Sequence, residues 1–174
     1  MDSAAFDALK DWHDFYIVIG TASATLIGAM FVVVSIGTGY LTEARAAAAR
    51  PFLAPTTIHL SMVLFGCAFT VVPSLGWIGF GLIYGIGGAA GLAYSAVVAL
   101  RVRRRNVDIV DRIWYGLVPF LGYGVMAAAA GMAFRREVAA LDTLAAGFVV
   151  ILLAAMRNAF DMIFYLVTRQ RDSR

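Results

Sequence analysis

The residues best suited to chemistry lie in one short stretch near the end of the chain, Met156–Asp161. Arg157 and Asp161 are four residues apart, so on a helix their side chains share a face and can pair; Asn158 and Tyr165 extend that face. The stretch interrupts an apolar run, and a charge at bilayer depth is costly unless it has a partner. The spacing therefore predicts a polar cluster on one membrane helix.

His59 is the second candidate, because it interrupts another apolar run. At a rise of 1.5 Å per residue, His59 and the charged pair lie at a similar depth, roughly 10–16 Å from one membrane face. We expect Ser35, Tyr94, Ser95 and Tyr123 at the same level. Such a cluster suits ion passage, proton relay or anchoring of an anionic headgroup. Three other interpretations stay open: a structural ion pair, an arginine that extends to the interface, and a core histidine with its hydrogen bonds satisfied.

Hydroxyl and small side chains mark further helix faces. Thr21, Thr25, Gly28 and Ser35 follow one another at near-heptad spacing, which suits either a hydrated path or hydroxyls that bond back to the preceding turn and pack. Small residues that recur at four-residue spacing predict close helix packing and assembly of several copies of the chain. These are Gly20, Ala24 and Gly28; Gly81 and Gly85, then Gly87, Gly91 and Ser95; and Gly124, Ala128 and the offset pair Ala127 and Gly131.

The composition requires these residues to stand on membrane helices. Apolar residues make up 61% of the 174 positions and charged residues only 14%, whereas soluble domains are nearer half and a quarter. A spanning helix needs roughly 20 apolar residues. The sequence therefore predicts a single all-α domain, a transmembrane bundle of about five spans, near residues 15–41, 51–75, 76–100, 113–134 and 138–168, after a possible interfacial helix over residues 1–14.

Arginine placement predicts the orientation of that bundle. With five spans the connections alternate sides, and the side of the C-terminus receives ten of the 14 Lys and Arg residues. That side should be cytoplasmic, which places the N-terminus outside. The run Arg101, Arg103, Arg104 and Arg105 directly follows the third span, so we expect it to contact anionic lipid headgroups rather than nucleic acid.

Several functional classes are disfavoured. The chain has no P-loop, GxSxG, HExxH or zinc pattern, and Cys67, its only cysteine, lies in an apolar run. Bis-histidine haem needs two histidines within the spans, and only His59 lies in one. A retinal Schiff base needs a lysine within a span, and the predicted spans contain none. We therefore expect no metal and no cofactor, and an enzyme is less favoured than a non-enzyme. The expected partners are lipid, further copies of the chain and ions.

Two segments resemble a group of small bacterial membrane proteins that have no established activity. These are the first span, with GTASATLIGAMFVVVSIG from Gly20 to Gly37, and the last, with RNAFD. The resemblance implies a multi-helix fold in the bacterial inner membrane and carries over no functional residue. The leading functional hypothesis is a homo-oligomeric ion channel or transporter. The alternatives are a regulatory or scaffold subunit of a larger membrane complex and, third, a lipid- or quinone-binding enzyme.

Overall fold

A computed structural model describes residues 3–38, 43–104 and 109–171, and side chains over 10–32, 34–35, 54–103 and 109–161. Every regular element in these ranges is a helix, which confirms the predicted all-α class. In chain order they are α1 (Ser3–Thr38), α2 (Glu43–Thr70), α3 (Trp77–Arg104), α4 (Ile109–Arg112), the π-helical segment η1 (Ile113–Leu117), α5 (Val118–Phe134) and α6 (Ala139–Arg171). Segments α4, η1 and α5 follow one another without a break and form one rod.

Four helical stretches are long and apolar enough to cross a membrane: Lys10–Val32, Trp77–Arg103, Ile109–Phe134 and Ala139–Asp161. Helix α2 contributes a shorter apolar stretch, Ala54–Thr70. Helix α1 is continuous from Ser3, so the described part of the predicted interfacial segment extends the first helix instead of forming a separate one. The protein is a multi-pass membrane protein by the length and composition of its helices.

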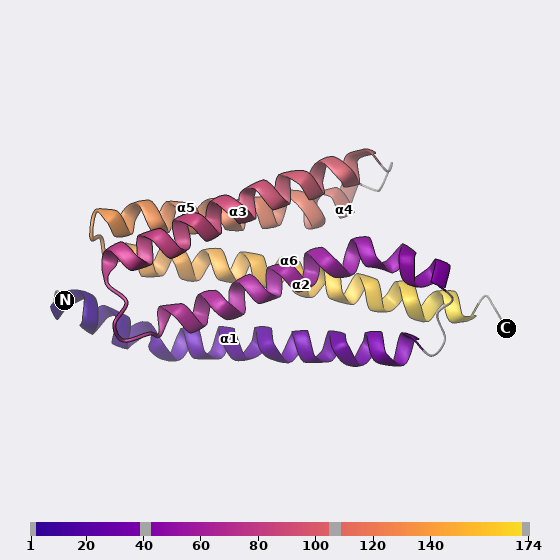
Figure 1. The fold of residues 1–174 in the computed structure, drawn as a ribbon, viewed down its shortest axis with the longest axis horizontal. Helices are drawn as coiled ribbons and strands as arrows, with labels where there is room; N and C mark the ends of the chain where they lie inside the picture. The colour runs from indigo at the N-terminus through magenta and orange to yellow at the C-terminus, as the bar shows by residue number, and fades with distance from the viewer. Residues whose placement is uncertain (1–2, 39–42, 105–108, 172–174) are drawn as a thin grey trace.

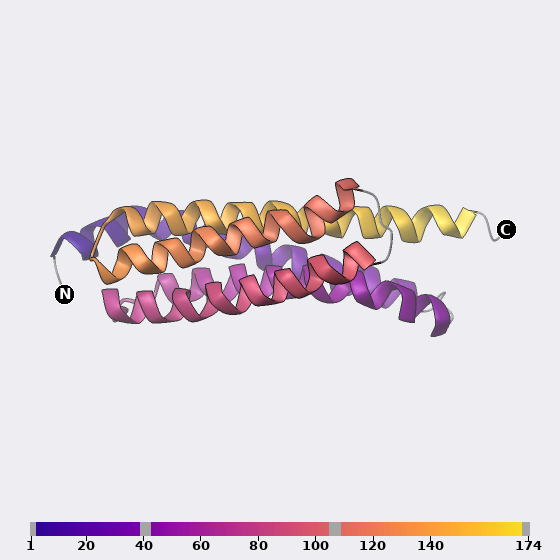
Figure 2. The same cartoon turned by 90° about the horizontal axis from the view of Figure 1, so that it is seen from above.

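Helix α6 occupies the centre of the bundle, with α5 on one side and α1 and α2 on the other (Figure 1). Helix α3 packs on the far side of α5 and contacts α2 only slightly. The start of α1 and the links α2–α3 and α5–α6 lie at one end, hereafter the N end; the end of α3, the start of α4 and the end of α6 lie at the other, the C end (Figure 1). Helices α2 and α6 extend past the start of α4 at the C end (Figure 2).

The glycines of α3 allow its close approach to the α4–η1–α5 rod. A Cβ at Gly88 would lie 3.0–3.1 Å from backbone and Cβ atoms of Ala127, and one at Gly91 would overlap the ring of Tyr123. Gly87 faces the terminal methyl group of Met126 in the same way. Lipid offers no hydrophobic drive for helix association, so backbone proximity of this kind holds membrane helices together. The glycine-rich face of α3 is therefore used within the protomer.

The two links at the N end are short and have distinct causes. Helix α2 ends at Thr70, ahead of the predicted span end at Leu75, and Pro73 lies in the turn that leads to α3. After α5, Arg136 has a φ of 59°. Its N–H bonds to the Ala133 carbonyl at 2.9 Å, and the Glu137 N–H bonds to the Met132 carbonyl at 3.1 Å. This pair of bonds is the Schellman motif, which reverses the chain into α6.

Candidate functional site

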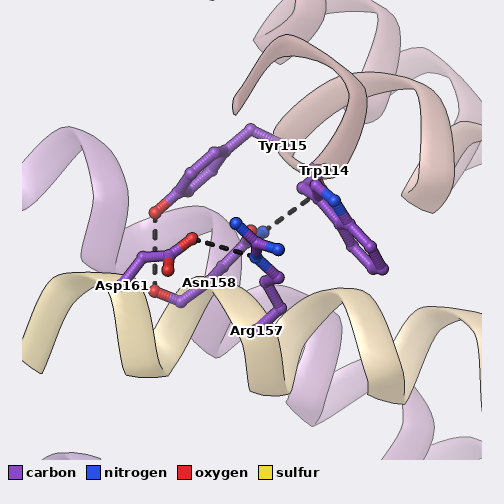
Figure 3. Close-up of polar contacts among 5 residues, drawn as sticks. All are labelled: Trp114, Tyr115, Arg157, Asn158 and Asp161. Atoms are coloured by element: carbon purple, nitrogen blue, oxygen red, sulfur yellow. Dashed lines mark hydrogen bonds and ion pairs between the residues drawn. The ribbon is translucent and has the colours of Figure 1, made fainter. Parts of the chain in front are cut away.

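Arg157 and Asp161 pair along one face of α6 (Figure 3). The Arg157 Nε lies 3.3 Å from Asp161 Oδ2, and the two side chains are 40% and 38% exposed. The guanidinium carbon also lies 5.2 Å from the centre of the Trp114 ring in η1. The pair is thus partly exposed beside an aromatic side chain, and it does not stand alone in the core.

Asn158, the next residue of α6, is buried and joins α6 to η1 (Figure 3). Its Nδ2 donates to the Trp114 carbonyl at 3.4 Å, and the Tyr115 hydroxyl donates to the Asn158 carbonyl at 3.4 Å. The Oδ1 atom has no hydrogen-bond partner among the described residues. We call Trp114, Tyr115, Arg157, Asn158 and Asp161 the arginine cluster.

The arginine cluster lies toward the C end, near the start of the α4–η1–α5 rod. Trp114 lies near the start of the apolar stretch Ile109–Phe134, two residues after Arg112. Arg157 lies roughly 27 Å along α6 from Ala139 at 1.5 Å per residue, and the helix continues past Asp161 to Arg171. The charged residues Asp111 and Arg112 place the Trp114 side of the cluster toward the interface at the C end. The side chain of Tyr165 lies outside the described residues.

His59 belongs to a second group of contacts, where α2 faces α3 and α5. Its Nδ1 lies 2.8 Å from the Tyr123 hydroxyl, and its ring meets the Tyr94 ring at 5.9 Å between centroids. His59, Ser95 and Tyr123 are fully buried. His59 Nε2 and Ser95 Oγ have no hydrogen-bond partner among the described residues. We call His59, Tyr94 and Tyr123, together with the buried Ser95 that follows Tyr94 in α3, the histidine cluster.

The expected common level thus divides into two sites. His59 lies with Tyr94 and Tyr123, three residues that helix rise places at one depth. Arg157 lies instead over the ring of Trp114, which is about two and a half turns nearer the C end of its rod than Tyr123. Ser35 is exposed on α1, away from the core, and has interactions of its own.

The hydroxyl face of α1 points out of the protomer. Thr21, Thr25 and Gly28 are all exposed, and the Thr25 hydroxyl donates to the Thr21 carbonyl at 2.9 Å. This bond is the back-bonding that the packing interpretation requires. The face therefore lines no path inside a single copy of the chain.

The small residues of α1 separate into two faces. Gly20 is buried, and a Cβ built on it would lie 3.1 Å from Cys67 Cβ in α2. Ala24 and Gly28 are exposed, and nothing lies within 4 Å of a Cβ built at Gly28. Gly20 is thus the buried member of this predicted packing stripe, because successive four-residue steps rotate by about 40° around a helix of 3.6 residues per turn.

Several buried polar contacts were not foreseen from the sequence. The Ser23 hydroxyl donates to the Leu60 carbonyl at 2.7 Å, and the Tyr16 hydroxyl donates to the Leu141 carbonyl at 2.8 Å. The Tyr84 hydroxyl donates to the Gly66 carbonyl at 2.7 Å. The α1 contacts had a detectable signal, since Tyr16, Ser23 and Met30 recur at heptad spacing and all are buried.

The basic run after the third span begins at the C end. Arg101 and Arg103 are exposed at the end of α3. The side chain of Arg104 and the whole of Arg105 lie outside the described residues. Within the described part of the chain, no three His, Cys, Asp or Glu residues gather as a metal site would require.

The chain matches no family model, no curated protein and no solved structure. Its class consequently follows from its own helices: it is a multi-pass integral membrane protein that encloses one buried polar cluster and carries a second near the C end. The resemblance to small bacterial membrane proteins stays a prediction.

Proposed function

We propose that the protein is a homo-oligomeric ion channel or transporter and that the histidine cluster contacts the moving species. The observation that carries this proposal is the fully buried His59, whose Nε2 lacks a partner among the described residues, as does the Ser95 hydroxyl. Buried polar groups are normally hydrogen-bonded, and an exception calls for water, an ion or a ligand. Ionisable residues inside membrane helices mark ion and proton pathways by default.

The chemistry of His59 suits proton or ion passage. A neutral imidazole has one donor and one acceptor nitrogen, so the bond at Nδ1 to Tyr123 fixes the role of Nε2. If the Tyr123 hydroxyl donates to Nδ1, then Nε2 carries the hydrogen and offers it. If Nδ1 donates instead, Nε2 accepts. Either form exchanges a proton through the ring, and Ser95 adds a hydroxyl that both donates and accepts.

Assembly of several copies is proposed from the outward small-residue faces. Thr21, Ala24, Thr25 and Gly28 are exposed on α1, and Ala128 and Gly131 are exposed on α5. The two helices lie toward opposite sides of the bundle, with α6 between them (Figure 1). Close helix approach between copies would cover these faces. In a ring it would also place the threonine hydroxyls of α1 at an interface between copies.

We also propose that the C end is cytoplasmic and that the membrane is a bacterial inner membrane. Arg101, Arg103 and Arg112 stand at the C end, and Arg135 and Arg136 at the N end. An Arg101→Cys variant should react with an impermeant maleimide only after permeabilisation, whereas Arg136→Cys should react in intact cells. The reverse pattern would invert the orientation and leave the transport proposal unaffected.

Flux into proteoliposomes tests the transport function. We expect proton or potassium entry above that of empty liposomes, and a loss of at least about tenfold in His59→Gln and in Tyr123→Phe. His13→Gln is the matched control, because His13 is exposed on α1 and its one hydrogen bond among the described residues is to its neighbour Asp14. Thermal unfolding in detergent identifies variants that simply fail to fold. Wild-type flux equal to that of empty liposomes would eliminate the proposal.

The exposed α1 and α5 faces equally suit a regulatory or scaffold subunit that binds helices of another protein. This second candidate predicts that the purified protein shows no flux. It also predicts that the protein co-purifies with one defined membrane partner. It also requires that substitutions on α1, and not His59→Gln, abolish the association.

A further inference from the structure

The arginine cluster has the composition of a headgroup site. Trp114 presents its ring to the Arg157 guanidinium at 5.2 Å, near the start of the apolar stretch Ile109–Phe134 and two residues after Arg112. Tryptophan is enriched where the hydrocarbon meets the headgroups, since its ring is apolar and its N–H is polar. Arginine in the same layer meets lipid phosphate. The tryptophan and the charged residues just before it, Asp111 and Arg112, thus point to the same layer of the membrane.

Arg157 is held before any ligand arrives. Its Nε donates to Asp161, and the Trp114 ring covers one side of the guanidinium (Figure 3). Among the described residues, the structure gives the two Nη groups no acceptor of their own. Those groups form a fork that matches two phosphate oxygens. Because the side chain is already ordered, binding loses less conformational entropy than it would for a free arginine.

The electrostatics of the C end favour an anion although the Arg157–Asp161 pair is itself neutral. The described charged side chains here are Arg101, Arg103, Arg112 and Arg157 against Asp111 and Asp161, a balance of 4 − 2 = +2. A basic rim of this kind attracts anionic lipids from the surrounding bilayer. A zwitterionic headgroup gains little from it.

Asn158 supplies an independent observation beside Arg157. Asn158 is 1% exposed, and its Nδ2 donates to the Trp114 carbonyl. Its Oδ1 accepts no hydrogen bond from the described residues. An acceptor buried next to a phosphate-binding arginine suits a ligand that carries donors, such as the hydroxyls of a glycerol headgroup or a water held beneath it.

We propose that Arg157, Trp114 and Asn158 form a binding site for the phosphate of an anionic phospholipid at the C end of the bundle. Asp161 accepts from the Nε of the arginine and, as a carboxylate, competes with the phosphate for it. The site is separate from the histidine cluster, so it stands whether or not the protein conducts ions.

Lipid retention in nanodiscs tests this site. The protein is placed in phosphatidylcholine with increasing phosphatidylglycerol, and bound lipid is counted by native mass spectrometry alongside thermal unfolding. We expect phosphatidylglycerol to be retained over phosphatidylcholine and to raise Tm. Arg157→Gln should reduce that retention by about tenfold or more, as the loss of a charge-assisted hydrogen bond implies. Arg157→Lys keeps the charge but lacks the forked guanidinium, so its retention of phosphatidylglycerol should lie between that of the wild type and that of Arg157→Gln.

Two controls separate a lipid site from a structural ion pair. Arg135→Gln removes an exposed arginine at the N end and should leave retention unchanged. Asp161→Asn removes the competing carboxylate, so retention should hold or rise, whereas a purely structural pair predicts equal damage from both partners. Equal retention of the two lipids, or wild-type retention by Arg157→Gln, would overturn the proposal. Stabilisation in phosphatidylcholine by inorganic phosphate alone would assign the site to a soluble anion and overturn the lipid assignment.

Discussion

The side-chain amide of Asn158 in α6 donates to the backbone carbonyl of Trp114 in η1 over 3.4 Å. In a regular α-helix that carbonyl would accept from Val118, but the Val118 N–H bonds to the Ile113 carbonyl instead. The next residue, Pro119, has no N–H to offer. Asn158 therefore provides the donor that the backbone of the π-helical turn lacks, and π-helical turns of this kind are frequent at functional sites.

Asn158→Leu should destabilise the bundle by about 1 kcal/mol, because it leaves the Trp114 carbonyl without a donor. Pro119→Ala restores an N–H at the start of α5, so the same substitution should cost less in that background. A double-mutant cycle of unfolding free energies in detergent measures the difference. Additivity of the two changes within about 0.3–0.5 kcal/mol would show that the amide and the proline are independent.

Gly91→Ala should destabilise by about 1–3 kcal/mol, because the added methyl group overlaps the Tyr123 ring and forces α3 and α5 apart. Gly124→Ala is the matched control, since a Cβ there meets nothing within 4 Å. It should be neutral or slightly stabilising, as alanine favours the helix. Thermal unfolding of both variants in one detergent compares them. Equal losses would indicate a general effect of glycine replacement in these helices.

The all-helical membrane class was predictable because it depends on composition and run length, which need no knowledge of neighbours. Depth was partly predictable for the same reason: counting helix rise placed His59, Tyr94 and Tyr123 at one level, where the structure has them in contact. The same count placed Arg157 at the level of His59, whereas in the structure Arg157 lies over the ring of Trp114.

Helix rotation was predictable only in part. The heptad row Tyr16, Ser23 and Met30 marks the buried face of α1. The spacing of small residues does not, because Ala24 and Gly28 lie on the exposed side although they share a spacing with the buried Gly20. The π-helical turn also escaped sequence reasoning. Pro119 has no N–H and so leaves a carbonyl of this helix without its donor, but which helix supplies a donor depends on how α6 packs.

Arg136→Gly should stabilise the protein by about 1 kcal/mol. Arg136 has a φ of 59°, a conformation that costs an L side chain energy and that glycine adopts freely. The two Schellman hydrogen bonds are made by the backbone, so the substitution keeps them. Arg136→Val should destabilise, because a β-branched side chain fits this region worst. Melting temperatures of the two variants are the readout, and a lower Tm for Arg136→Gly would show that the arginine side chain contributes more than its backbone conformation costs.

Gly28→Cys should cross-link between copies of the chain in native membranes if α1 forms the oligomer interface. Gly28 is exposed, and nothing within 4 Å of its Cβ position obstructs a neighbour. The test uses a Cys67→Ala background, although Cys67 is itself buried. Ile86→Cys is the control, because Ile86 is 70% exposed but lies on α3, outside the small-residue faces. Covalent dimer from Gly28→Cys alone places α1 at the interface. Equal yields from both positions would indicate random collision, and the pore would then have to lie within one protomer, along the histidine cluster.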